Sequence, residues 1–106
     1  MENKKKAETF IGFAVRTGRY KTGLNAVSTL KRARLVILCK SASDNTKEEG
    51  RKFALKFRCP LLVTEEKTLG ELVFKDGVKI MAITDKDIAK AIIDNKETVL
   101  TDLSGV

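Results

Sequence analysis

The 106-residue sequence contains no histidine and no tryptophan, and it has one proline and two cysteines. Histidine is the commonest general acid or base in enzymes, so the usual side chain for proton transfer is missing. Two cysteines without histidine cannot supply the four ligands of a typical zinc site. No apolar run approaches the roughly 20 residues of a membrane-spanning helix. We therefore expect a protein without a metal centre, a cofactor or a membrane segment.

Catalytic and phosphate-binding motifs are also missing. None of the serines stands in a Gly-x-Ser-x-Gly elbow. The segment from Gly18 to Gly23 lacks the Lys-Ser/Thr ending of a P-loop, and there is no Gly-x-Gly-x-x-Gly fingerprint. Asp85 and Asp87 could form a metal pair but suit the first turn of a helix better. We expect a protein that is not an enzyme; a small α/β enzyme would need a site made only from Asp, Glu, Lys, Ser or Thr.

The two cysteines lie in different surroundings. Cys39 belongs to an apolar run of strand length, and Cys59 directly precedes Pro60. The pair lacks the Cys-x-x-Cys spacing of a redox centre. Both are expected to be reduced, buried packing residues.

Acidic residues are scarce in the first part of the chain. Residues 1–60 carry 15 basic and 5 acidic side chains, whereas residues 61–106 carry 6 basic and 9 acidic ones. The window between Glu8 and Asp44 has no acidic residue and contains Arg16, Arg19, Lys21, Lys31, Arg32, Arg34 and Lys40. Such one-sided charge is typical of a protein that binds a polyanion, although a basic face without a partner has the same composition.

Helical periodicity alternates with short apolar runs along the sequence. Helices are expected at 7–17, from 22 to about 33, at 43–57, from 64 to about 73 and at 84–95. Strands are expected at about 19–21, 35–39, 61–63 and 79–83. Threonines at positions 22, 64 and 84 are the expected N-caps of three of these helices. The alternation predicts an α/β fold, a three-layer α/β/α sandwich in a single domain, 1–106, with its core at about 7–95 and a loose tail at 96–106.

The start of the second predicted helix lies within the acid-free window. Gly23 would let another backbone approach closely, and the Asn25 side chain has both a donor and an acceptor with which to read a base edge. Unpaired N–H groups at a helix start suit a phosphate. A simple capped helix start would have the same sequence. The candidate RNA-binding residues in this region are Arg19, Lys21, Thr22, Gly23, Leu24, Asn25, Lys31 and Arg32.

Two loops beyond the carboxyl ends of strands are further candidates, because ligands favour that position in α/β sheets. The loop before the last helix combines an apolar residue, a hydroxyl and a cation, a mix that suits a splayed nucleotide. Its residues are Ile83, Thr84, Asp85 and Lys86, and the loop after the 35–39 strand supplies Lys40 and Asn45.

Several segments resemble one protein family in the same order along the chain. They are 11–19 (IGFAVRTGR) with Thr22-Gly23, 33–38 (ARLVIL), 41–47 (SASDNTK), 59–61 (CPL), 68–72 (TLGEL) and 82–86 (AITDK). Over about residues 8–95 the sequence is similar to the large-subunit ribosomal protein "seven-Ae" family, particularly its short bacterial members of YlxQ and YbxF type.

The resemblance implies an α/β/α sandwich around a mixed four-stranded sheet. It also implies binding to kink-turn RNA, a sharply bent duplex with tandem sheared G·A pairs. In that family a Gly-x-Asn-Glu…Lys pattern at the start of the second helix contacts those pairs and the backbone; Gly23 and Asn25 match it. The loop before the last helix packs against the flipped-out nucleotide, and residues 83–85 occupy that loop here.

Two positions depart from the family pattern. Ala26 stands where Glu is frequent, and Thr29 stands where Lys is frequent. We expect this loss to weaken base reading more than general RNA affinity. Lys31 or Arg32, about a helical turn away, could compensate electrostatically.

The leading hypothesis is a cytoplasmic, monomeric protein that binds structured RNA, of ribosomal or regulatory kink-turn type, without catalysis. The ribosome is a candidate partner. The alternative is a protein-protein interaction module on the same fold, in which RNA binding is weakened or lost.

Overall fold

Helices alternate with strands, as the sequence predicts. The structure is a computed structural model that describes residues 6–65, 67–95 and 100–102. The helices are α1 (Lys6–Thr17), α2 (Leu24–Ser28), α3 (Asp44–Phe57), α4 (Leu69–Val73) and α5 (Lys86–Asp94). The strands are β1 (Tyr20–Thr22), β2 (Leu35–Leu38), β3 (Leu61–Thr64), β4 (Ile80–Ile83) and β5 (Leu100–Asp102).

The strands form one mixed sheet in the order β1-β4-β2-β3-β5. β2 and β3 are parallel, and the other neighbouring pairs are antiparallel. The predicted α/β class and mixed sheet are confirmed. The sheet has one strand more than the expected four, because Leu100–Asp102 pairs with β3. This strand also corrects the expectation of a loose tail at these three positions. Residues 96–99 and 103–106 of that tail lie outside the described residues.

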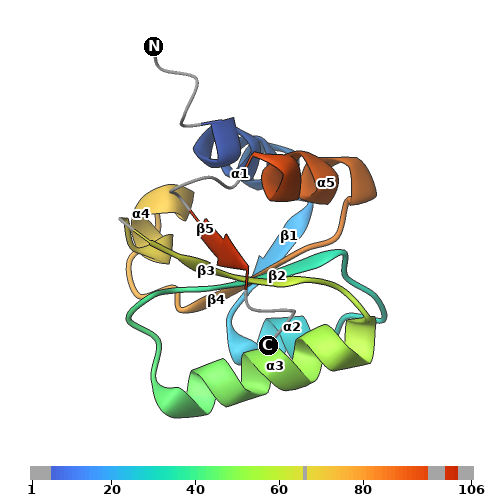
Figure 1. Ribbon diagram of the computed structural model, residues 1–106, viewed down its shortest axis with the longest axis vertical. Helices are drawn as coiled ribbons and strands as arrows, with labels where there is room; N and C mark the ends of the chain where they lie inside the picture. The colour runs from blue at the N-terminus through green and yellow to red at the C-terminus, as the bar shows by residue number, and fades with distance from the viewer. Residues whose placement is uncertain (1–5, 66, 96–99, 103–106) are drawn as a thin grey trace.

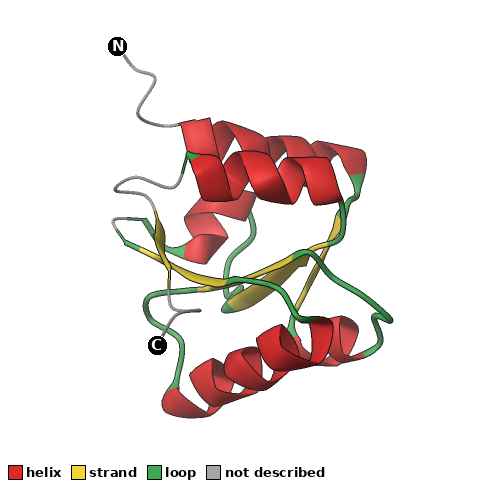
Figure 2. Ribbon diagram, turned by 45° about the vertical axis from the view of Figure 1, so that its right-hand side comes forward, coloured by secondary structure: helices red, strands yellow, loops and turns green. Residues whose placement is uncertain are grey.

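The helices lie on both faces of the sheet, which gives the predicted three layers. α1, α4 and α5 cover one face, with α1 and α5 side by side, and α2 and α3 cover the other (Figures 1 and 2). The longest of them, α3, has 14 residues. None of the described helices is long and apolar enough to cross a membrane.

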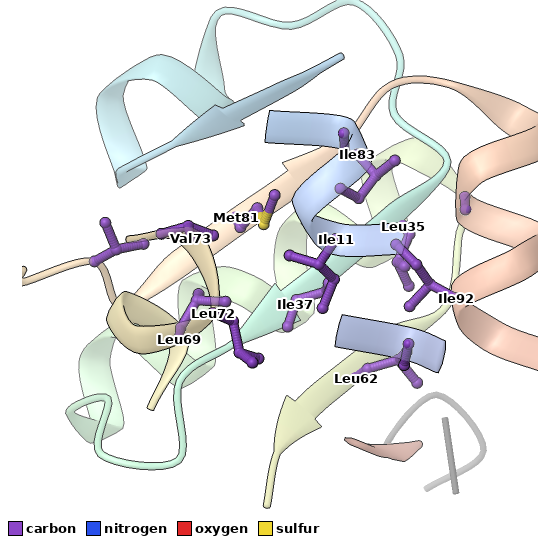
Figure 3. Packing of buried hydrophobic residues seen from close by; sticks show 14 of the residues in the cluster. Ile11, Leu35, Ile37, Leu62, Leu69, Leu72, Val73, Met81, Ile83 and Ile92 are labelled. Carbon is purple, nitrogen blue, oxygen red and sulfur yellow. The ribbon is translucent and has the colours of Figure 1, made fainter. Parts of the chain in front are cut away.

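Successive residues of the central strand β2 point to opposite faces of the sheet, so the strand belongs to both cores. Leu35 and Ile37 pack in the cluster with α1, α4 and α5, and part of this cluster is shown in Figure 3. Val36 and Leu38 pack in the cluster with α2 and α3. All four side chains are fully buried, and burial of each stabilises the fold by about 1.5–3 kcal/mol. The continuous apolar run at 35–38 therefore reflects coverage on both faces.

The start of α4 differs from the prediction. Thr64 is not an N-cap: it ends β3, is 2% exposed, and its Oγ1 accepts a hydrogen bond from the Lys40 backbone N–H at 2.9 Å. α4 begins five residues further on, where Thr68 and Glu71 form a capping box. In that box Thr68 Oγ1 accepts from the Glu71 N–H at 3.2 Å, and Glu71 Oε1 accepts from the Thr68 N–H at 2.7 Å. The later start leaves residues 65, 67 and 68 outside both β3 and α4.

Both cysteines carry free thiols, as expected. Cys39 is fully buried, which confirms its predicted packing role. Cys59 is only half-buried, because it follows the end of α3 at the surface. Burial still raises the pKa of the Cys59 thiol to about 11, so the thiol is neutral at pH 7.

Candidate functional site

The candidate residues lie at two opposite ends of the sheet, which the strand register defines. At one end the Gly23 N–H donates to Ile80 O at 3.1 Å, and the Cys39 N–H donates to Lys79 O at 2.8 Å. At the other end the Arg34 N–H donates to Ile83 O at 2.8 Å. We call the first the Gly23 end, comprising residues 22–26, 39–46 and 74–80. We call the second the Arg34 end, comprising residues 18–19, 31–34, 58–60 and 83–86.

The predicted site residues are divided between these ends. Those at the Gly23 end are Thr22, Gly23, Leu24, Asn25, Lys40 and Asn45. Those at the Arg34 end are Arg19, Lys31, Arg32, Ile83, Thr84, Asp85 and Lys86. Lys21 is exposed in β1, between the two ends. The expectation that Arg19, Lys31 and Arg32 surround the turn at 22–25 is wrong, because β1 and the loop after α2 carry them to the opposite end.

The turn between β1 and α2 depends on Gly23. Its φ of 90° and ψ of 147° belong to a region that side chains with a Cβ rarely adopt. Gly23, and not Thr22, is the N-cap of α2, so no side chain caps this helix start. The Gly23 carbonyl accepts from the Val27 N–H at 3.0 Å. Among the described residues, the hydrogen bonds that hold this turn are backbone bonds, and Gly23 itself is exposed.

Asn25 is exposed in the first turn of α2. Its backbone carbonyl accepts from Ser28 Oγ at 2.7 Å. Its side-chain amide makes no hydrogen bond with any residue that the structure describes. A carboxamide in this state has its N–H groups and oxygen available for an external partner.

α2 is much shorter than predicted and ends at Ser28. Beyond it the Thr29 N–H bonds Ala26 O at 3.2 Å, and the Leu30 N–H bonds Val27 O at 3.1 Å, a tighter pattern than that of an α-helix. Thr29 Oγ1 also donates to Ala26 O at 2.7 Å. Such local hydroxyl bonds compete with the helical pattern. Because the helix stops here, Lys31 and Arg32 cannot stand one helical turn beyond the departure at Thr29.

An open hollow of about 620 Å³ adjoins the Gly23 turn. A smaller hollow, of about 260 Å³, lies at the Arg34 end. One wall of the larger hollow is residues 22–26, and the facing wall is residues 76–80, with Thr46 of α3 beside them. The sequence reasoning missed this second wall. Asp76-Gly77 is a common turn signal and could have marked it. Gly77 has a φ of 81°, and Phe74, two residues before Asp76, is left-handed and 83% exposed.

The charges around this hollow are mixed. Lys79 Nζ donates to Ser41 Oγ at 2.7 Å, which fixes the side chain against the loop after β2. Asp76 contributes a carboxylate to the wall, whereas Lys75 and Lys40 are exposed cations in the same set of loops. A polyanion at this end would therefore be held by a few cations and by backbone groups.

Three residues of the loop before α5 are engaged in contacts within the fold. Ile83 is 0% exposed within the core, so it cannot contact a nucleotide. Thr84 does not cap α5; its N–H donates to Arg19 O at 3.1 Å. Asp85 is the N-cap: its carboxylate accepts from the Ile88 N–H at 2.9 Å and from Arg19 at 2.6 Å.

These contacts explain the ionisation of Asp85. The hydrogen bond from the Ile88 N–H, aided by the Arg19 guanidinium, holds the pKa of Asp85 below its ordinary value of 3.8. Arg19 is therefore engaged in a structural ion pair. Lys86, in contrast, is exposed at the start of α5.

The described residues contain no group of three His, Cys, Asp or Glu side chains that could hold a metal ion. No protein-family model and no curated protein matches the chain. Among solved structures, the chain is similar to a protein with unknown function from Bacillus halodurans C, with 22% identity and a TM-score of 0.72. The match covers 85% of this chain and 95% of that one. At this identity the likeness shows the fold alone, and it supports the α/β architecture.

Proposed function

We propose that this protein binds structured RNA of kink-turn type without catalysis, as a member of the ribosomal family that its sequence resembles. One observation carries the proposal: the exposed Asn25 carboxamide, without a described partner, stands in a glycine turn beside an open hollow. We place the contact with the kink-turn itself at the Gly23 end and at Lys21, which directly precedes it in β1. The loop at 83–86 is not part of this contact.

The physical support lies in the backbone as much as in charge. Because Gly23 has no Cβ, a sugar-phosphate backbone can approach the turn closely. The first N–H groups of α2 lack partners within the helix, although five residues give only a small helix dipole. Asn25 can donate to and accept from a base edge at once. Reading of bases and positioning by phosphate therefore come from the same turn.

The second wall of the hollow supplies a charge that this sequence lacks at the two positions where it departs from the family pattern. Neither Ala26 nor Thr29 offers a charge, and the Thr29 hydroxyl is already bonded to Ala26 O. Lys79, which lines the same hollow as Asn25, provides a cation that Ser41 orients. Phe74, two residues before this wall in the sequence, carries a large exposed ring, and stacking on an aromatic ring is how proteins commonly hold a splayed base. We assign the contact with the flipped-out nucleotide to the segment 74–79.

Binding of two RNAs tests this function. One is a kink-turn RNA, and the other is an unbent duplex of the same length and base composition. We expect tighter binding of the kink-turn RNA. If four to six phosphates are contacted, log affinity falls with log salt at a slope of about −4 to −5. Titrations by gel shift or fluorescence anisotropy at several salt concentrations give both quantities.

The possible results separate the hypotheses. Equal affinity for both RNAs would remove the kink-turn assignment but leave RNA binding. Absence of binding to either RNA at low salt would contradict the proposed function and favour the protein-interaction alternative. In that case pull-down partners should survive nuclease treatment.

A further inference from the structure

A second hollow, of about 260 Å³, lies at the Arg34 end between the end of α3 and the outer face of α5. Four cations line it: Arg34, Arg58, Lys86 and Lys90. The only carboxylate in its lining is Asp94, which pairs with Lys90 at 2.8 Å. The chain thus brings positive charge from three segments distant in sequence into one concave place.

The remaining three cations are uncompensated. Arg34, Arg58 and Lys86 make no side-chain hydrogen bond or ion pair with any residue in 6–65, 67–95 and 100–102. Arg51 and Lys52 on α3, in contrast, lie within ion-pair distance of Glu48 and Glu49. What sets the hollow apart is that three cations without a described partner share one concave lining.

Arg58 is unusual in its backbone as well. It caps the C-terminus of α3 in the left-handed conformation, with a φ of 55° and a ψ of 48°. Glycine, or less often asparagine, is the usual residue at such a position, because a Cβ is crowded there. The sequence places a long cation where a side chain is disfavoured. The neighbouring Cys59 thiol is neutral, because burial raises its pKa to about 11, and adds no negative charge.

We propose that this hollow is a second anion-binding site, which holds a phosphodiester group of the RNA beyond the part bound at the Gly23 end. The proposal rests on the proposed function for its source of phosphate. Two guanidinium groups can each fork onto phosphate oxygens, and Lys86 adds a point charge. The volume is several times the roughly 30 Å³ of a water molecule, which leaves room for a phosphate and part of its sugar. The protein would then contact its RNA at both ends of the sheet.

The test compares two triple variants. Arg34→Gln, Arg58→Asn and Lys86→Gln together empty the hollow of unpaired charge; asparagine at 58 tolerates the left-handed backbone. Lys6→Gln, Arg51→Gln and Lys52→Gln remove the same charge from exposed positions on α1 and α3 outside the hollow. Each is titrated with a minimal kink-turn RNA and with the same RNA carrying a longer arm. Thermal unfolding checks that both variants fold.

The wild-type protein should bind the long-armed RNA about tenfold more tightly than the minimal one. The hollow variant should lose this gain. Its salt slope with the long-armed RNA should become less steep by about 0.7–0.9, the contribution of one phosphate contact. The control variant should keep the gain. An equal loss in both variants, or no gain in the wild type, would overturn RNA as the occupant of the hollow.

A titration with inorganic phosphate separates this inference from the proposed function. The amide resonances of Arg34, Arg58 and Lys86 should shift saturably in the wild-type protein and not in the hollow variant. If the protein binds no RNA yet these shifts occur, the proposed function fails and the anion site stands with another source of phosphate. Absence of saturable shifts would overturn the anion site itself, whatever the RNA titrations give.

Discussion

The Gly23 end and the Arg34 end of the sheet expose different kinds of chemical group to solvent. The Gly23 end is built from two turns with glycines at positive φ, Gly23 and Gly77, and from the neutral amide of Asn25. Its larger hollow contains one oriented cation, Lys79, and one carboxylate, Asp76. The Arg34 end has a smaller hollow lined by the Lys90–Asp94 pair and by three cations that pair with no residue in the described part of the chain, Arg34, Arg58 and Lys86. One end thus offers backbone and hydrogen-bonding groups, and the other offers cations.

This difference indicates how one small fold could divide the work of recognition. Base edges are discriminated by donors and acceptors held in fixed positions, which suits the Gly23 end. Phosphates are held by cations without regard to sequence, which suits the Arg34 end. The net charge of +7 alone would not separate these roles. Their separation follows from the directions of the strands, which place residues 22–26 and 39–46 at one end of the sheet and residues 31–34 and 83–86 at the other.

The largest expected effect concerns the sheet that joins the two ends. Ile37 is 0% exposed in the middle of β2, so Ile37→Ala should lower the free energy of unfolding by about 2–5 kcal/mol. Urea denaturation followed by circular dichroism measures the change. Lys52→Ala, on the exposed face of α3, should change it by less than about 0.5 kcal/mol. Similar values for the two variants would mean that the buried layer is misplaced.

The next effect sharpens the comparison at the Gly23 end. Asn25→Ala should reduce the preference for kink-turn RNA over unbent duplex by about 1–3 kcal/mol, because a bidentate base contact is lost. Lys21→Ala should weaken binding of both RNAs alike, because it removes a phosphate contact. Asn95→Ala removes a carboxamide from the end of α5, where it bonds Ala91 O, and should leave the preference unchanged. If Asn25→Ala retains the full preference, the readout lies elsewhere.

A smaller effect distinguishes Thr68, which caps a helix, from Thr84, which was expected to cap one and does not. Thr68 caps α4 and Thr84 caps nothing, since Asp85 caps α5. Thr68→Ala should cost about 1 kcal/mol of unfolding free energy. Thr84→Ala should cost less, because its hydroxyl takes no part in the cap. Equal costs, measured by thermal unfolding, would contradict the helix starts described for α4 and α5.

The smallest effect is a dependence of stability on pH at the Arg34 end. The lowered pKa of Asp85 means that its carboxylate stabilises the folded state above the unfolded pKa near 3.8. That contribution is lost as the pH falls through the lower, folded pKa. The stability difference between wild type and Asp85→Asn should therefore be constant near pH 6 and shrink below about pH 4. A difference that stays constant from pH 6 to pH 3 would show that Asp85 is not engaged by Ile88 and Arg19.

Long patterns in the sequence were sufficient to predict much of the fold. The apolar runs at 35–38 and 80–83 gave β2 and β4, and the periodic segments gave α1 and α3 within one or two residues. Ser43 caps α3, with its Oγ accepting from the Thr46 N–H at 3.2 Å. These elements are specified by burial over many residues.

The rest depends on interactions that no local pattern displays. α2 ends early because the hydroxyls of Ser28 and Thr29 bond carbonyls three residues back. β5 forms only through pairing with β3, about 40 residues away in sequence. The expectation that Arg19, Lys31 and Arg32 surround the Gly23 turn was wrong for a similar reason. Which loops are neighbours depends on the antiparallel pairing of β4 with β1 and β2. Asn25 could be found by its residue type and position, whereas Arg58 could not.

The most direct test maps the bound surface by NMR, with isotope-labelled protein and a minimal kink-turn RNA that has short arms. We expect the largest shifts of backbone amides at residues 22–26 and 74–80, with residues 83–86 little changed. Shifts concentrated at 83–86 and the loop before β2, with the Gly23 turn unaffected, would contradict the placement of RNA recognition at the Gly23 end.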